Sequence, residues 1–156
     1  MYELLKKQIK SIFEGEQALI SNSANFSALL FNSLENINWL GFYFYDGQDL
    51  MVGPFQGKPA CTRIAPGKGV CGTAFLNNEI QVVEDVHQFP GHIACDPDSK
   101  SELVIPIVKN NKIYGVFDVD SPIINRFNVN DVENFKALVG YYIENTDFSN
   151  NPSIKC

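Results

Sequence analysis

Apolar positions at the start of the chain recur with the spacing of an amphipathic helix. Over residues 1–13 they lie three or four positions apart, and Gly15 interrupts them. A broad apolar face resumes over residues 17–35. The pattern therefore predicts two N-terminal helices, the first of them within residues 1–14.

The pattern then changes to that of short strands. Residues 38–45 are largely aromatic, and residues 49–55 follow across Asp46-Gly47, a pair typical of hairpin turns. A third strand is predicted over residues 58–64. Because strands joined by tight turns run in opposite directions, these segments favour an antiparallel sheet.

The middle of the chain is less regular. Residues 67–69 form a glycine-rich turn that lacks the rest of a phosphate-binding loop, and residues 70–76 are typical of a short helix. After a brief predicted strand at 80–83, residues 84–101 show no periodicity. Such long irregular segments are uncommon inside compact domains and are often functional.

Two further strands and a helix complete the pattern. The strands, residues 103–108 and 112–120, are joined across Asn110-Asn111, which tolerate the left-handed backbone of a tight turn. The last helix is predicted to begin after Asn128, a favourable N-cap residue. The order of elements predicts one α+β domain: an antiparallel sheet with the N- and C-terminal helices packed on one face. It spans residues 1–156, and residues 147–156 are expected to form a frayed tail.

Composition and charge narrow the class of partner. The 156 residues include 12 Lys and Arg against 18 Asp and Glu, a net charge of −6. This charge argues against sequence-independent binding to nucleic acid or to an anionic membrane. The charged N-terminus and the absence of a long apolar run predict a cytoplasmic protein with no membrane span.

The four cysteines, at positions 61, 71, 95 and 156, are therefore not expected to form a static disulfide framework. Cys95 lies in the polar segment, where a thiol is accessible. Cys71 lies near a predicted helix N-terminus, which favours the thiolate. By position alone, Cys61 and Cys71 are more typical of core residues.

A metal site is the alternative interpretation of these residues. It would draw on Cys71, His87, His92 and Cys95, but their spacing matches no common zinc pattern. Solvated loop histidines are the simpler explanation, so no metal is expected.

Two carboxylates are predicted to share one face of a strand. Asp118 and Asp120 lie two residues apart, so both could bind an ammonium group or hold a proton between them. Equally, this face could be solvated. A two-residue turn would place Glu102 opposite Val119, on the wrong face, unless a bulge near Pro106 shifts the register.

At these residues the sequence resembles the free methionine-(R)-sulfoxide reductases, single-domain enzymes of the GAF fold. The resemblance runs from Gly15 to Tyr142. Its motifs include Asn38-Trp-Leu-Gly-Phe-Tyr43, Gly53-Pro-Phe-Gln-Gly-Lys58, Cys61-Thr-Arg-Ile64, Gly69-Val-Cys-Gly-Thr-Ala74, Glu84-Asp-Val-His87, Gly91-His-Ile-Ala-Cys-Asp96, Ser101-Glu102 and Asp118-Val-Asp-Ser121.

The resemblance implies a thiol cycle that converts free L-methionine (R)-sulfoxide to L-methionine. Cys95 would be the nucleophile and would become a sulfenic acid. Cys61 would resolve it as a disulfide, with Cys71 as the alternative resolving residue. Thioredoxin would then reduce the disulfide, and no bound cofactor would be needed.

The resemblance also assigns a substrate pocket. Glu102, Asp118 and Asp120 would engage the amino group and assist protonation, while Trp39 and Tyr43 would form an apolar wall against the S-methyl group. It further implies a homodimer. Cys156 lies outside the matched region and is expected to be dispensable. The rival functions are a GAF sensor that binds a small molecule without catalysis and a metal-stabilised interaction domain.

Overall fold

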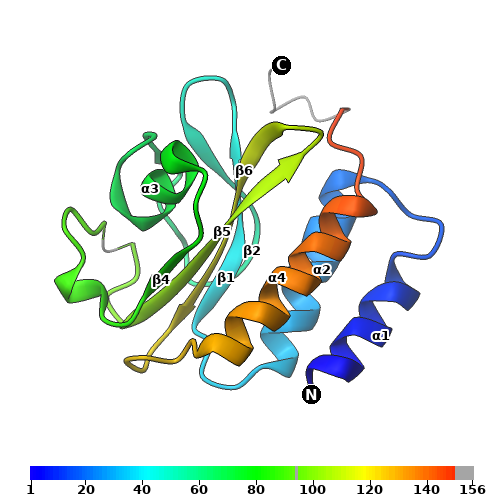
Figure 1. Ribbon diagram of the computed structural model, residues 1–156, viewed down its shortest axis with the longest axis horizontal. Coiled ribbons are helices and arrows are strands. Elements are labelled where there is room, and N and C mark those ends of the chain that lie inside the picture. Colours follow the sequence, from blue (N-terminus) through cyan, green and yellow to red (C-terminus); the bar gives the residue numbers. More distant parts are fainter. Residues whose placement is uncertain (94, 150–156) are drawn as a thin grey trace.

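The computed structural model describes residues 1–93 and 95–149, and within them the strands form one antiparallel sheet of order β3-β2-β1-β6-β5-β4 (Figure 1). The helices are α1 (Tyr2–Ile12), α2 (Leu19–Ser33), α3 (Gly69–Asn77) and α4 (Val129–Glu144), with a 3₁₀ turn at Val86–Gln88. The strands are β1 (Trp39–Tyr45), β2 (Leu50–Gly57), β3 (Arg63–Ile64), β4 (Gln81–Val83), β5 (Ser101–Lys109) and β6 (Lys112–Ser121). The expected α+β domain is confirmed.

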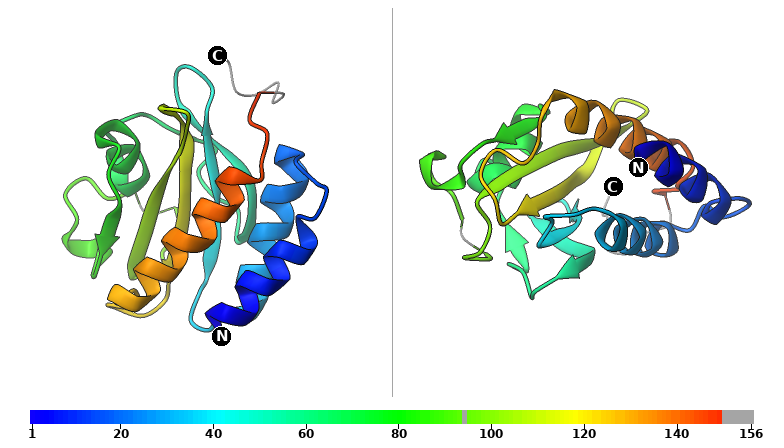
Figure 2. Two further views of the ribbon diagram at one scale, coloured as in Figure 1. Left: turned by 45° about the vertical axis from the view of Figure 1, so that its right-hand side comes forward. Right: turned by 90° about the horizontal axis from the view of Figure 1, so that it is seen from below.

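Three helices cover one face of this sheet. Figures 1 and 2 show α1, α2 and α4 grouped together on the same side. The core between them and the sheet is largely aromatic: Phe26, Phe42, Phe117 and Tyr142 are all fully buried and in ring contact. Burial of such large side chains supplies most of the favourable free energy of folding.

The short helix α3 lies on the opposite face, so the helices are divided between the two sides of the sheet (Figure 1). Val70, Cys71 and Ala74 of α3 pack against Val104 and Val116 of the central strands. This helix is apolar on the side that meets the sheet, and this face of the sheet carries apolar residues beside three carboxylates. The candidate site lies between α3 and this face of the sheet.

The predicted strand over residues 58–64 is largely wrong. Only Arg63 and Ile64 pair with β2, and Cys61 lies in the segment that precedes them. Pro59 cannot donate a backbone hydrogen bond to a neighbouring strand. The carbonyl groups of Lys58 and Cys61 instead accept hydrogen bonds from side chains of β1.

A β-bulge sets the register between β5 and β6. Asn110 and Asn111 form the predicted tight turn with positive φ angles of 52° and 62°. Between the pairs Val108–Ile113 and Ile107–Gly115, β6 contains one extra residue, Tyr114. The bulge therefore lies at Tyr114, not at Pro106 as expected. Its effect is the predicted one, because Glu102 now lies opposite Asp120.

The C-terminal helix begins as the sequence predicts. The Asn128 side chain accepts from the backbone N–H of Asp131, and the Asp131 carboxylate accepts from the backbone N–H of Asn128. The expected frayed tail differs from the structure over residues 147–149, since Asp147 bridges to Ala18 and Phe148 is buried. Cys156 lies outside the described residues. None of the helices among the described residues is long and apolar enough to cross a lipid bilayer.

Gly115 allows close contact between β6 and β1, which gives a test of the register. A methyl group on Gly115 would overlap the carbonyl oxygen of Tyr43 and lie 2.9 Å from the Cα of Phe44. We expect Gly115→Ala to lower the free energy of unfolding by about 1–3 kcal/mol, measured by urea denaturation. Gly140→Ala is the control, because Gly140 lies in α4 with nothing within 4 Å of the added methyl group and alanine favours helix. Equal stability of the Gly115→Ala variant and the wild type would contradict the close contact.

Candidate active site

A pocket opens on the α3 side of the sheet, beside the segment 92–99 in which residue 94 is not described. Its empty volume is about 500 Å³, a figure that includes solvent at the open mouth. It is lined by residues of β1, β3, α3, β5, β6, this segment and the loops before β3 and α3: Trp39, Tyr43, Pro59, Ala60, Ile64, Lys68, Gly69, Val70, Cys71, His92, Ile93, Cys95, Asp96, Ser99, Glu102, Asp118 and Asp120. The pocket thus gathers all the predicted site residues except Cys61.

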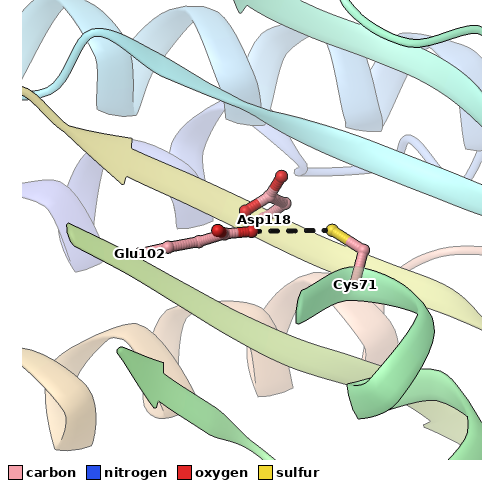
Figure 3. Close-up of side chains that lie close together, drawn as sticks. All are labelled: Cys71, Glu102 and Asp118. Atoms are coloured by element: carbon pink, nitrogen blue, oxygen red, sulfur yellow. Dashed lines mark hydrogen bonds between the residues drawn. The ribbon is translucent and has the colours of Figure 1, made fainter. Parts of the chain in front are cut away.

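Three carboxylates from two neighbouring strands meet on the floor of this pocket. Glu102 of β5 lies opposite Asp120 of β6, and Asp118 is two residues further along the same face. Figure 3 shows the Glu102 and Asp118 carboxylates side by side, facing Cys71 of α3. Glu102 and Asp118 are buried and Asp120 is half-buried. The prediction that Asp118 and Asp120 share a face is confirmed, and this face is enclosed by α3 instead of being open to solvent.

Burial and crowding make these carboxyl groups unusually basic. Burial raises the pKa of Asp118 from its ordinary 3.8 to about 6. The pKa values of Glu102 and Asp120 are raised well above their usual range, first by burial and then by the negative charge of Asp118. One oxygen of Asp118, Oδ1, is buried without a hydrogen-bond partner among the described residues. The cluster can therefore hold protons near neutral pH and has an acceptor free for a ligand.

Cys71 is a core residue, and its thiol stays protonated. Its Sγ lies 3.9 Å from Oε1 of Glu102, to which it donates a weak hydrogen bond. Burial, followed by the charges of Asp118 and Glu102, raises the pKa of Cys71 well above its usual value. The expectation that the helix N-terminus favours a Cys71 thiolate is wrong, because the field of the carboxylates and the loss of solvation outweigh the helix dipole.

The other two described cysteines form a disulfide at the edge of the pocket. Cys61 and Cys95 are joined with a Cα–Cα distance of 5.6 Å, and both residues are half-buried. They belong to two irregular segments, one preceding β3 and one preceding β5. The disulfide is compatible with a reversible thiol cycle and connects the pocket wall at Cys95 to a segment outside the sheet.

Trp39 and Tyr43 of β1 form an aromatic wall of the pocket. Their rings stack with centroids 5.9 Å apart, and Trp39 also stacks on Phe55 at 5.2 Å. Both side chains are buried, but each polar atom has a partner. The wall is therefore apolar toward the pocket and fixed in orientation.

Of the residues of the metal alternative, Cys71, His92 and Cys95 line the pocket, but His87 does not. Cys95 is in the disulfide, and His87 is exposed and pairs with Asp85. His92 does reach the pocket, with Nε2 3.8 Å from Oε2 of Glu102. Burial, followed by the charge of His87, lowers the pKa of His92, which favours a neutral imidazole there.

Known proteins share this arrangement of fold and sequence. The GAF domain family matches residues 26–142. A protein of Escherichia coli named free methionine-R-sulfoxide reductase is 48% identical over 88% of this chain and 84% of its own. This chain belongs to the free methionine-R-sulfoxide reductase family of GAF domains. Protein YtsP of Bacillus subtilis is 56% identical over 81% of this chain and 78% of its own.

A solved structure extends the comparison. The structure of fRMsr of Staphylococcus aureus in complex with substrate has a TM-score of 0.89 and 52% identity, and the match covers 94% of this chain and 95% of that one. The GAF fold and the family resemblance predicted from the sequence motifs are therefore confirmed.

In this member of the free methionine-R-sulfoxide reductase family, the segment that carries Cys95 is anchored to the sheet by residues that the sequence did not identify. Asn38, next to β1, donates through Nδ2 to Oδ2 of Asp96 and to Oγ of Ser99, both at 3.0 Å. Asp96 is buried and also accepts from the backbone N–H of Asp98 at 2.9 Å. The run Asp96-Pro-Asp-Ser99 is typical of a turn and is the sequence signal that could have pointed to this anchor.

The raised pKa of Asp118 predicts how stability depends on pH. Its proton is retained by the folded protein between about pH 4 and 6, where the unfolded chain has lost it, so this contribution to stability is full at low pH and lost as the pH rises through about 6. Asp118→Asn should match the wild type near pH 4 and exceed it by up to about 3 kcal/mol above pH 7. Urea denaturation at both pH values is the measurement. Glu79→Gln removes an exposed carboxylate as the control; a gain of the same size in that variant would show that the effect is only general charge repulsion.

Proposed function

We propose that this protein reduces free L-methionine (R)-sulfoxide to L-methionine. The observation that carries the proposal is a half-cystine, Cys95, in the wall of a pocket whose floor holds Glu102, Asp118 and Asp120. The E. coli and S. aureus relatives support it through the activity and the substrate complex that their descriptions name. The reaction is an oxidoreduction at sulfur.

The pocket offers a partner for each group of a free amino acid. The ammonium group would bind the carboxylate cluster, where Oδ1 of Asp118 lacks a partner among the described residues. The carboxylate would lie at the N-terminus of α3, whose first residues Gly69 and Val70 line the pocket and whose helix dipole favours an anion. The S-methyl group would pack on Trp39 and Tyr43. Methionine sulfoxide within a peptide lacks both charged groups and would bind poorly.

The chemistry follows from the residues around the sulfoxide. The Cys95 thiolate would attack the sulfoxide sulfur, and the oxygen would pass to Cys95 as a sulfenic acid while methionine leaves. The oxygen needs a proton during this transfer. Glu102 and Asp118, whose pKa values are raised, are suited to supply it near neutral pH.

Cys61 is the proposed resolving cysteine, and the disulfide with Cys95 supports this role. Cys71 is less suited, because it is buried and the neighbouring carboxylates keep it protonated, whereas the thiolate is the reactive form. Thioredoxin is the proposed reductant of the disulfide, and the cytoplasm is the proposed location of the cycle. Homodimerisation, which the resemblance implies, stays a prediction that sedimentation analysis can test.

The substrate is tested with a coupled assay. We expect NADPH consumption, in the presence of thioredoxin and thioredoxin reductase, with the free R sulfoxide. The free S sulfoxide and a peptide-bound R sulfoxide should each give at most a few per cent of that rate, because neither can place all of its groups in the pocket as the free R sulfoxide does. Binding of the free R sulfoxide without turnover would support the sensor function instead.

The cysteine roles are tested by single-turnover methionine release without a reductant. Cys95→Ser should release no methionine, because it lacks the nucleophile. Cys61→Ser should release one equivalent of methionine and then stop, with Cys95 left as the sulfenic acid. Cys71→Ser should still form the Cys61–Cys95 disulfide. A Cys71–Cys95 disulfide trapped from the wild type during turnover would overturn the assignment of Cys61.

A further inference from the structure

The segment Lys58–Cys61, which carries the proposed resolving cysteine, lies between β2 and β3 and receives hydrogen bonds from side chains of β1. The sheet fixes the residues on either side of it: Gly57 pairs with Trp39, and the carbonyl oxygen of Thr62 accepts from the backbone N–H of Val52 at 3.0 Å. The indole Nε1 of Trp39 donates to the carbonyl oxygen of Lys58 at 3.1 Å, and the hydroxyl of Tyr43 donates to the carbonyl oxygen of Cys61 at 3.1 Å. Two donors from β1 thus hold both ends of the segment.

These two donors are rigid. Trp39 and Tyr43 are 3% and 2% exposed, their rings stack, and β1 lies between β2 and β6 near the middle of the sheet. Burial, followed by the negative charge of Asp118, raises the pKa of Tyr43. Its hydroxyl therefore stays protonated and remains a donor to Cys61.

A second link to the segment is weaker. The Lys58 ammonium pairs with Asp98 and lies 3.9 Å from Oδ1 of Asp96, which connects the two cysteine segments. Lys58 and Asp98 are both more than half exposed, and exposed ion pairs contribute little to stability. The hydrogen bonds from Trp39 and Tyr43 are therefore the stronger side-chain contacts to this segment, and the one from Tyr43 reaches Cys61 itself.

We propose that Tyr43, together with Trp39, is a positioning residue for the second step of the cycle, in which Cys61 closes on the oxidised Cys95. This inference rests on the proposed function. In that step the Cys61 thiolate attacks the Cys95 sulfur, a sulfur–sulfur bond forms, and the S–O bond of the sulfenic acid breaks. The departing hydroxide takes the proton released by the Cys61 thiol and leaves as water.

The step requires the attacking sulfur close to Cys95 and in line with the S–O bond, and a free loop would meet this condition only part of the time. The hydroxyl of Tyr43 holds the backbone of Cys61 itself, so its loss allows the thiol to move away. The ring of Tyr43 also forms part of the pocket wall. The ring therefore serves substrate binding and the hydroxyl serves disulfide closure, so removing the hydroxyl alone tests the second role.

The variant Tyr43→Phe removes this oxygen and keeps the ring. Reduced protein is mixed with one equivalent of free methionine (R)-sulfoxide in the absence of thioredoxin, and quenched samples are assayed for methionine and for the Cys61–Cys95 disulfide. A dimedone-type reagent traps the Cys95 sulfenic acid. We expect disulfide formation to slow about five-fold relative to methionine release, the effect of losing one hydrogen bond, and the trapped sulfenic acid to rise accordingly.

Two further variants sharpen the result. Tyr45→Phe is the matched control, because Tyr45 lies on the same strand, packs against Phe75 and does not line the pocket; it should keep the wild-type ratio of the two rates. Trp39→Phe removes the donor to Lys58 and should lower this ratio in the same direction as Tyr43→Phe. An unchanged ratio in Tyr43→Phe, or equal slowing of both steps, overturns the inference. Absence of methionine from the wild type is a different outcome, which overturns the proposed function.

Discussion

The position of one extra residue in β6 determines which side chains meet in the pocket. Successive residues of a strand point to opposite faces, so a shift of one residue exchanges the two faces. With the tight turn at Asn110-Asn111 alone, Glu102 would face the core with Val119. The bulge at Tyr114 instead pairs Glu102 with Asp120, and Leu103 with Val119. The same residue thus completes the acidic cluster on one face and the apolar core on the other.

Bringing these carboxyl groups together costs stability. Each loses hydration, and the charge of Asp118 opposes ionisation of Glu102 and Asp120. The large aromatic core on the opposite face, with Phe26 and Phe42 fully buried, offsets this cost. An ammonium group bound among these carboxylates would relieve the repulsion, so the proposed substrate would offset part of this cost. The stability of the core thus allows the fold to hold a carboxyl cluster that by itself lowers the free energy of unfolding.

The sequence predicted what depends on neighbouring residues and failed where distant ones decide. The helix after Asn128, the turn at Asn110-Asn111 and the shared face of Asp118 and Asp120 follow from local pattern, and all are confirmed. The sequence favours a bulge near Pro106, but the bulge lies at Tyr114, next to Gly115, where β6 contacts β1 closely. The raised pKa of Cys71 depends first on its burial and then on carboxylates 31 or more residues away in sequence, neither of which a local pattern contains.

The contrast between the cysteines follows from where each segment lies relative to these carboxylates. Cys71 is fixed on α3 against Glu102, in a field that suppresses the thiolate. Cys61 and Cys95 lie on irregular segments at the rim, where both are half-buried and their disulfide can form without disturbing the sheet. In the proposed cycle, the two sulfur atoms that form the disulfide would therefore lie at the rim of the pocket, and the groups that hold protons would lie on its floor. The hydroxyl of Tyr43, a residue of the pocket wall, donates to the carbonyl oxygen of Cys61 and so connects the wall to the rim.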